Sequence, residues 1–267
     1  MQNWKTIELI KRENLGENYW AQGFFYEDFG KKEYFRRDFE ELRYRDLSLF
    51  TLGQIESKII LDVGCGDGLY TLTFLKLGAR YVAGQDISVE SVNRAQNNCK
   101  KNGFSNFEIK SGNCEKLLFD NSTFDTVFSG DVFEHITKEQ KINFINEIYR
   151  VLKPGGFFTI KTPNKDYLMV STLLKKTYSA LKFKNPFKIH IPHTKNNPDN
   201  EHHGLTTYKE LSRIFSNTMF HEPFVTYQVL NKKNVPNIIT RLFKKSKYFN
   251  QHIIITVRKP YFYGLYN

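Results

Sequence analysis

Short apolar runs alternate with longer amphipathic stretches between residues 58 and 164. Strands that alternate with helices at this spacing indicate βαβ units, and therefore a parallel sheet covered on both faces. Right-handed crossovers then favour a doubly wound, Rossmann-like α/β fold. The predicted strands are Ile59–Val63, Tyr81–Gln85, Phe107–Ile109, Phe124–Ser129 and Gly156–Lys161, and the predicted helices are Gly68–Leu77, Val89–Asn102 and Lys138–Leu152.

The pattern differs on either side of this core, residues 58–164. Residues 1–57 repeat apolar side chains every three or four positions, which predicts an N-terminal helical cap in the substrate region. The alternation stops after Thr162-Pro163-Asn164, so residues 165–206 are expected to form an insert or lid, with a helix at Leu168–Leu181. Residues 207–267 open with a capping box at Thr207 and hold two further predicted strands, which bring the mostly parallel sheet of the same domain to seven strands.

Composition excludes several classes of protein. The chain has 267 residues, of which 40% are hydrophobic, and no apolar run approaches the roughly 20 residues that cross a bilayer. Charged residues follow Met1 where a secretory signal has an apolar stretch, so we expect a cytoplasmic protein with no transmembrane segment. Three cysteines at unrelated spacings fit neither a disulfide framework nor a zinc pattern.

Positive charge is concentrated in the C-terminal part of the chain. From Lys165 onward there are 17 Lys and Arg against 5 Asp and Glu, whereas the first 164 residues hold 22 against 23. A one-sided basic surface concentrates anionic partners such as nucleic acid, phosphorylated carriers or acidic lipid headgroups. The charge alone does not choose among them.

A glycine-rich loop carries the clearest chemical signal. The sequence Asp62-Val63-Gly64-Cys65-Gly66-Asp67-Gly68 follows a buried strand and leads into a helix, so a ligand can lie against backbone without meeting a Cβ atom. Asp86 ends the next strand, at the distance where a carboxylate accepts from the two hydroxyls of a ribose. Together they predict a ligand that contains adenosine.

The order Asp-x-Gly-x-Gly-x-Gly differs from a dinucleotide loop, because Asp62 opposes a phosphate but suits a cationic amino group. At this point the sequence resembles the class I S-adenosylmethionine (SAM)-dependent methyltransferases. The resemblance continues through Gly112-Asn113-Cys114-Glu115, Phe124-Asp125-Thr126-Val127, Glu134-His135-Ile136, Arg150–Gly156 and Thr162-Pro163-Asn164. Asn113 stands where that family usually has Asp, and its side-chain carbonyl can still accept a hydrogen bond from adenine.

The resemblance implies SAM as the cofactor and a role for each matching residue. It places Asp62, Gly64 and Gly66 around the methionyl part and the loop, Asp86 and Ile87 at the ribose and adenine, Asn113 and Cys114 at the adenine edge, and Ser129 and Gly130 beside the sulfonium.

Acid and base candidates cluster after the fourth predicted strand. His135 can act as a general base near neutral pH, with Glu134 and His203 as further catalytic candidates. Alternatively, Asp131, Glu134 and His135, with His202 further along, resemble the divalent-metal pattern of small-RNA 2′-O-methyltransferases and ubiquinone-pathway O-methyltransferases, although Asp131 replaces their Glu. A purely structural role for Glu134 and His135 is the third interpretation.

The acceptor is expected to contact the segments outside the core. We expect O-methylation of a small-molecule or glycan hydroxyl, on a free, phosphorylated or lipid-linked carrier. The basic C-terminal part and the two histidines favour RNA 2′-O-methylation as the alternative, and a non-catalytic SAM-binding subunit is a further one. Lysines interleaved with aromatic residues also suit peripheral contact with an anionic membrane.

Overall fold

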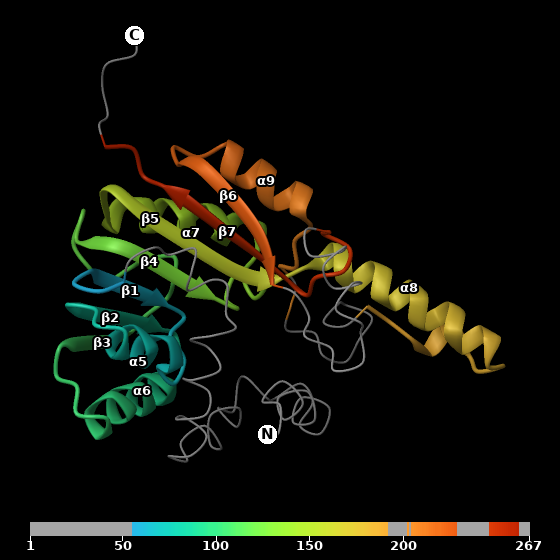
Figure 1. Ribbon diagram of the computed structural model, residues 1–267, viewed down its shortest axis with the longest axis horizontal. Coiled ribbons are helices and arrows are strands. Elements are labelled where there is room, and N and C mark those ends of the chain that lie inside the picture. Colours follow the sequence, from blue (N-terminus) through green and yellow to red (C-terminus); the bar gives the residue numbers. More distant parts are fainter. Residues whose placement is uncertain (1–54, 192–201, 203, 229–245, 262–267) are drawn as a thin grey trace, which may run out of the picture.

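The computed structural model describes residues 55–191, 202, 204–228 and 246–261, and the sheet it shows confirms the predicted α/β fold (Figure 1). Seven strands lie in the order β3-β2-β1-β4-β5-β7-β6. The elements are β1 (Ile59–Val63), α5 (Leu69–Lys76), β2 (Tyr81–Asp86), α6 (Val89–Lys101), β3 (Phe107–Ser111), β4 (Phe124–Gly130), α7 (Lys138–Val151), β5 (Leu152–Pro163), α8 (Lys165–Leu181), η2 (Pro186–Lys188), α9 (Tyr208–Ser216), β6 (His221–Gln228) and β7 (His252–Arg258).

The strand order reverses between β1 and β4. β1 pairs in parallel with both β2 and β4, so the chain runs outward in opposite directions from this point. β7 alone is antiparallel, between β5 and β6. In open α/β sheets, ligands bind beyond the carboxyl ends of the strands where the strand order reverses. The loops after β1 and β4 therefore form the expected binding edge.

Two apolar clusters hold the helices against the sheet. α5 and α6 supply residues such as Leu72 and Val92 to one cluster, together with β1 and β2. α7 and α9 supply residues such as Phe144 and Phe215 to the other, together with β4, β5 and β7. Burial of a side chain of this size contributes about 1.5–3 kcal/mol. Apolar packing therefore fixes the strand ends that carry the site.

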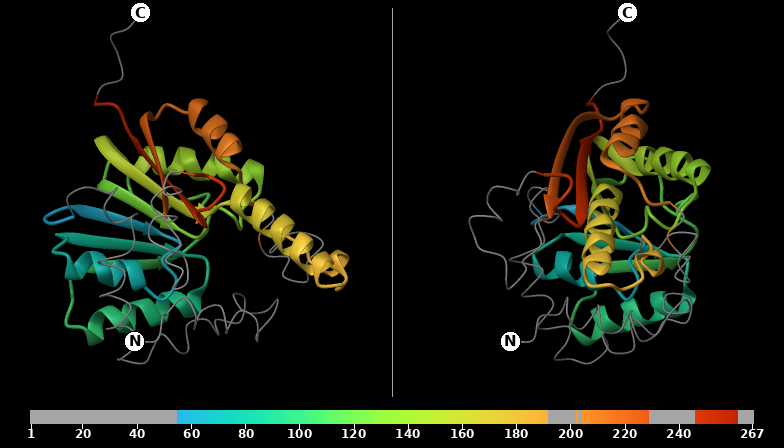
Figure 2. Two further views of the ribbon diagram at one scale, coloured as in Figure 1. Left: turned by 45° about the vertical axis from the view of Figure 1, so that its right-hand side comes forward. Right: turned by 90° about the vertical axis from the view of Figure 1, so that its right-hand side faces the viewer.

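Several segments differ from the boundaries that the sequence predicts, β5 and α8 among them. β5 begins at Leu152, directly after α7, because Lys153 and Pro154 already continue the strand. The helix expected within the insert begins at Lys165, three residues early, because the Asn164 side chain accepts from the Asp166 N–H and caps it. α8 then projects away from the sheet, as Figure 1 and the left view of Figure 2 show.

Several predicted features lie outside the described residues. They are the N-terminal cap apart from residues 55–57, the part of the insert at residues 192–201, His203, and the segment at residues 229–245. Within the described ranges, no helix is both long and apolar enough to span a membrane.

Candidate functional site

The glycine loop after β1 is held in a conformation that favours glycine. Gly64, Gly66 and Gly68 all have positive φ angles, of 74°, 50° and 82°. A Cβ atom on Gly64 would lie 2.0 Å from Val132 Cγ2 in the loop after β4. The loops after β1 and β4 therefore touch, and only glycine permits this approach.

Three aspartates surround the loop. Asp62 is buried and accepts a hydrogen bond of 2.7 Å from the Thr71 hydroxyl, and burial raises its pKa from 3.8 to about 7. Burial also raises the pKa of Asp67 to about 8, and within the described part of the chain neither of its carboxylate oxygens has a hydrogen-bond partner. Asp86 accepts from the Gly66 and Ser88 N–H groups at 2.9 Å each, and its pKa is raised, mainly by burial.

This acidic loop discriminates between classes of adenosine ligand. The negative charge of Asp86 opposes ionisation of the Asp62 and Asp67 carboxyl groups. A cationic ligand relieves that repulsion, whereas the pyrophosphate of a dinucleotide adds to it. SAM carries a sulfonium and an ammonium group, so these three carboxylates fit it. Sequence reasoning assigned no role to Asp67, because its orphaned carboxylate is visible only in the fold.

The predicted adenine side is open. Ile87 is 75% exposed beside Asp86 and offers an apolar surface, while Cys114 is half-buried. Asn113 is exposed, and its side-chain oxygen accepts from the Glu115 N–H at 2.9 Å. Gln85, which sequence reasoning missed, is buried and donates to the Asn113 carbonyl at 2.8 Å. The structure thus places these residues along one edge, with Gln85 positioning the segment of Asn113.

β4 ends beside the glycine loop. The Ser129 hydroxyl donates to the Val63 carbonyl at 3.0 Å, which ties the two central strands together next to Gly130. Asp131 follows with a positive φ of 56°, and its carboxylate oxygens lie 3.8 Å from Lys161 Nζ and 3.7 Å from His252 Nε2. Asp131 is not part of the group of potential metal ligands formed by its neighbours.

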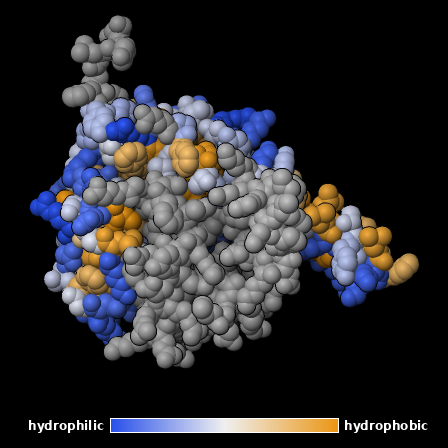
Figure 3. All heavy atoms as spheres, viewed as in Figure 1, coloured by the Kyte–Doolittle hydropathy of each residue, from blue (hydrophilic) through white to orange (hydrophobic). Residues whose placement is uncertain are grey.

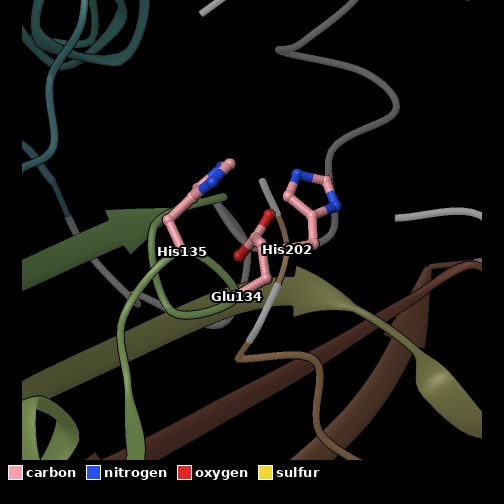
Figure 4. A group of neighbouring side chains, drawn as sticks. All are labelled: Glu134, His135 and His202. Atoms are coloured by element: carbon pink, nitrogen blue, oxygen red, sulfur yellow. The ribbon is translucent and has the colours of Figure 1, made fainter. Parts of the chain in front are cut away.

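Glu134, His135 and His202 form that group. One ligand atom from each lies within 4.8 Å of the others, and the rings of His135 and His202 are 4.5 Å apart at 74°. Figure 4 shows Glu134 between the two imidazoles, with all three side chains on the same side of the loop. Glu134 also accepts from the Thr162 hydroxyl of β5 at 3.0 Å. The structure therefore joins residues that are separated by more than sixty positions in the sequence.

Gly204 brings His202 to this group. Its N–H donates to the Glu134 carbonyl at 2.8 Å, and the buried Lys141 ammonium donates to the Gly204 carbonyl. A Cβ atom at position 204 would lie 2.2 Å from the Ile136 carbonyl oxygen, so the approach requires glycine. Burial lowers the pKa of Lys141 to about 8. Neither Gly204 nor Lys141 stood out in the sequence, because their partners are distant along the chain.

The acidic glycine loop lies where the strand order of the doubly wound sheet reverses, and the Glu134, His135 and His202 group lies at the same edge of the sheet. These features define an α/β enzyme domain for a cofactor that contains adenosine and carries positive charge. Comparison with known proteins names the family. Residues 60–156 match the family described as a methyltransferase domain, and this part of the chain is a class I SAM-dependent methyltransferase domain.

Individual relatives differ in chemistry. The chain is 35% identical to the mitochondrial ubiquinone biosynthesis O-methyltransferase of Rattus norvegicus, over 49% of this chain and 41% of that protein. It is 30% identical to a sterol 24-C-methyltransferase of Gibberella zeae, over 55% of this chain and 38% of that protein. The chain thus spans about two fifths of the length of these curated relatives.

Solved structures show the same fold. A SAM-dependent methyltransferase from Aquifex aeolicus superposes with a TM-score of 0.55 at 19% identity, over 82% of this chain and 92% of that one. At this identity the likeness concerns the fold alone. Oxygen and carbon acceptors occur among the sequence relatives, so the acceptor must be argued from this chain's own site.

Proposed function

We propose that the protein is an active SAM-dependent O-methyltransferase that acts on a small-molecule or glycan hydroxyl. The observation that carries the proposal is the Glu134, His135 and His202 group beside the end of β4. A hydroxyl acceptor needs a base before it attacks the methyl group, and these residues supply basic atoms where the acceptor is expected. The O-methyltransferase relative, at 35% identity, supports the same acceptor atom.

The chain's own residues have separate tasks in this reaction. SAM supplies an electrophilic methyl group when bound. Asp62 and Asp86 bind and orient the cofactor from the glycine loop, and Ser129 and Gly130 line the approach to the methyl group. His135 accepts the hydroxyl proton, while Glu134, fixed by Thr162, holds the imidazole group in place. Alignment of the two reactants contributes most of the rate, because the sulfonium is already reactive.

A divalent cation fits the same residues. Two imidazoles and one carboxylate are a ligand set found in catalytic zinc sites, where a further position stays open. Glu134, His135 and His202 would hold the ion, and a bound ion lowers the pKa of a hydroxyl group. Asp131 lies outside this set, since it faces Lys161 and His252.

RNA 2′-O-methylation is the second candidate. His202 supports it, because this residue matches the small-RNA metal pattern that the sequence resembles and lies beside Glu134 and His135 in the fold. The basic C-terminal part of the chain supports it as well. A glycan acceptor and a cytoplasmic location stay predictions.

A methyl-transfer assay tests these proposals. Labelled SAM is offered with pools of sugar nucleotides, lipid extract, phenolic compounds or short RNA, each with and without a chelator. Transfer to a hydroxyl of a non-RNA pool supports the first proposal, and loss of that transfer with chelator assigns a metal to the group. Transfer to RNA alone overturns it in favour of the second candidate.

Variants connect the assay to the site. His135→Ala and Glu134→Gln are expected to lower turnover by about 10²–10⁴-fold while calorimetry still detects SAM binding. His221→Ala, in the exposed start of β6, is the matched control and should retain full turnover. SAM binding without turnover in any pool, together with unchanged cellular function of His135→Ala, identifies a non-catalytic subunit and contradicts the proposal.

A further inference from the structure

The segment that projects from the sheet has an unusual distribution of side chains. We call residues 165–191, which comprise α8 and η2, the arm. Seven large apolar side chains on it are exposed, including Phe183 at 100%, Phe187 at 81% and Leu181 at 78%. The others are Met169, Leu173, Leu174 and Tyr178. Monomeric soluble proteins rarely expose apolar side chains in such a contiguous group.

The helix of the arm exposes its apolar side rather than burying it. At about 100° per residue, the five exposed apolar residues of α8 fall on one half of its circumference, and the buried Thr172 and Ser179 fall on the other. A helix that packs on a protein core shows the opposite pattern. The exposed half is therefore built to contact something apolar outside the described residues.

Charge specifies the partner further. The arm has six lysines and one aspartate. The aspartate, Asp166, accepts from the Tyr208 N–H at 3.0 Å at the base of the arm, far along the helix from its tip. The tip carries the exposed Lys182, Lys184 and Lys188 beside Phe183 and Phe187. Figure 3 shows apolar and hydrophilic residues side by side on the projecting part.

Phe183 occupies a position that normally belongs to glycine. The end of α8 is a Schellman turn, in which the Phe183 N–H donates to the Ala180 carbonyl at 3.0 Å and the Lys184 N–H to the Ser179 carbonyl at 2.9 Å. Phe183 has a φ of 54°, in the left-handed region, and this costs a non-glycine residue roughly 1–2 kcal/mol. A fully exposed ring gains no packing in return from the described residues, so a contact outside them explains the residue better.

We propose that the arm docks on the surface of an anionic phospholipid bilayer, with Phe183, Phe187 and the apolar side of α8 in the headgroup region and the lysines at lipid phosphates. Interleaved aromatic and basic residues are the chemistry of such interfacial segments. The proposal goes beyond the methyl-transfer function. Docking would also hold the site near the bilayer, because α8 begins directly after β5, whose Thr162 contacts Glu134.

Vesicle binding by the full chain tests the proposal. Phosphatidylcholine vesicles with and without phosphatidylglycerol are sedimented with the protein, and the bound fraction is measured at low and high salt. We expect binding to the anionic vesicles only, weakened by salt. Lys182→Glu combined with Lys184→Glu should lower the affinity at least about tenfold. Lys100→Glu combined with Lys101→Glu, at the exposed end of α6, is the matched control and should have little effect.

Phe183→Gly separates docking from folding. Glycine adopts the left-handed conformation freely, so this variant should unfold at the same or a higher temperature and yet bind vesicles about tenfold more weakly. Ile142→Ser, which removes an exposed apolar side chain from α7, should bind normally. Vesicle binding that is equal for wild type and Phe183→Gly overturns the proposal. The proposal is also overturned if the wild type binds no vesicles but forms a dimer that Phe183→Gly dissociates. It is overturned as well if the wild type binds short RNA and no vesicles.

Discussion

At the residue scale, Asp62 shows how a buried ligand-binding carboxyl group lowers the stability of the fold. Its pKa of about 7 lies above the ordinary 3.8, so the folded state keeps the proton longer and the free energy of unfolding falls as pH rises from about 4 to about 7. Asp62→Asn should therefore raise the Tm at pH 8 by about 2–4 °C, and by less at pH 5. The same variant should weaken SAM binding by about tenfold or more, measured by calorimetry.

The control for this prediction is Asp120→Asn, an exposed carboxylate remote from the loop. It should change neither the Tm at pH 8 nor the affinity for SAM. If Asp62→Asn instead lowers the Tm, and by as much at pH 8 as at pH 5, burial does not penalise the ionised Asp62 carboxylate.

Gly204 makes a second prediction at the residue scale. Gly204→Ala forces its segment away from the Ile136 carbonyl and should destabilise the fold by about 1–3 kcal/mol. Because Gly204 holds His202 beside Glu134, the variant should also lose affinity for Zn²⁺, measured by titration calorimetry. Gly103→Ala adds a methyl group where no atom lies within 4 Å, so it should keep the metal affinity of the wild type. Equal Zn²⁺ affinity in both variants would contradict the positioning role of Gly204.

At the scale of elements, Asn164 connects β5 to α8 and to the segment before β7. It is fully buried, caps α8, and donates from its side-chain nitrogen to the Asn250 carbonyl at 2.8 Å and to the Lys247 carbonyl. Asn164→Ala should cost about 2–3 kcal/mol in urea unfolding, because it removes the cap and leaves buried carbonyls without donors. Thr207→Ala removes the partly exposed cap of α9 and should cost about 1 kcal/mol. Equal costs would show that the contacts to Asn250 and Lys247 add nothing.

The whole molecule should be stabilised by the cofactor that its loop selects. At 100 times its Kd, SAM adds about 2.7 kcal/mol to the free energy of unfolding, which corresponds to a Tm increase of roughly 5–10 °C for a chain of this size. NAD, with its pyrophosphate, should give no shift, because the loop is acidic. A thermal-shift titration with both ligands checks this. In Asp62→Asn, with about tenfold weaker binding, the shift at the same SAM concentration should fall to about half or less. An equal shift with NAD would contradict the electrostatic argument.

Local sequence determined much of this protein. Glycine spacing, strand-end aspartates and the period of apolar residues are properties of a few neighbouring positions, so the sheet, the glycine loop around Gly64 and the family resemblance could all be predicted from them. The apolar pattern predicts the start of α8 three residues too late, since the Asn164 side chain that caps it is held by a distant partner, the Asn250 carbonyl.

Only the tertiary structure decided which distant groups meet. His202 joins Glu134 and His135 because Gly204 fits against the loop after β4, while Asp131 turns to Lys161 and His252. The orphaned carboxylate of Asp67 and the outward apolar side of α8 depend equally on what surrounds them in space. Burial and contact between remote segments set these features, and neither is a property of local sequence.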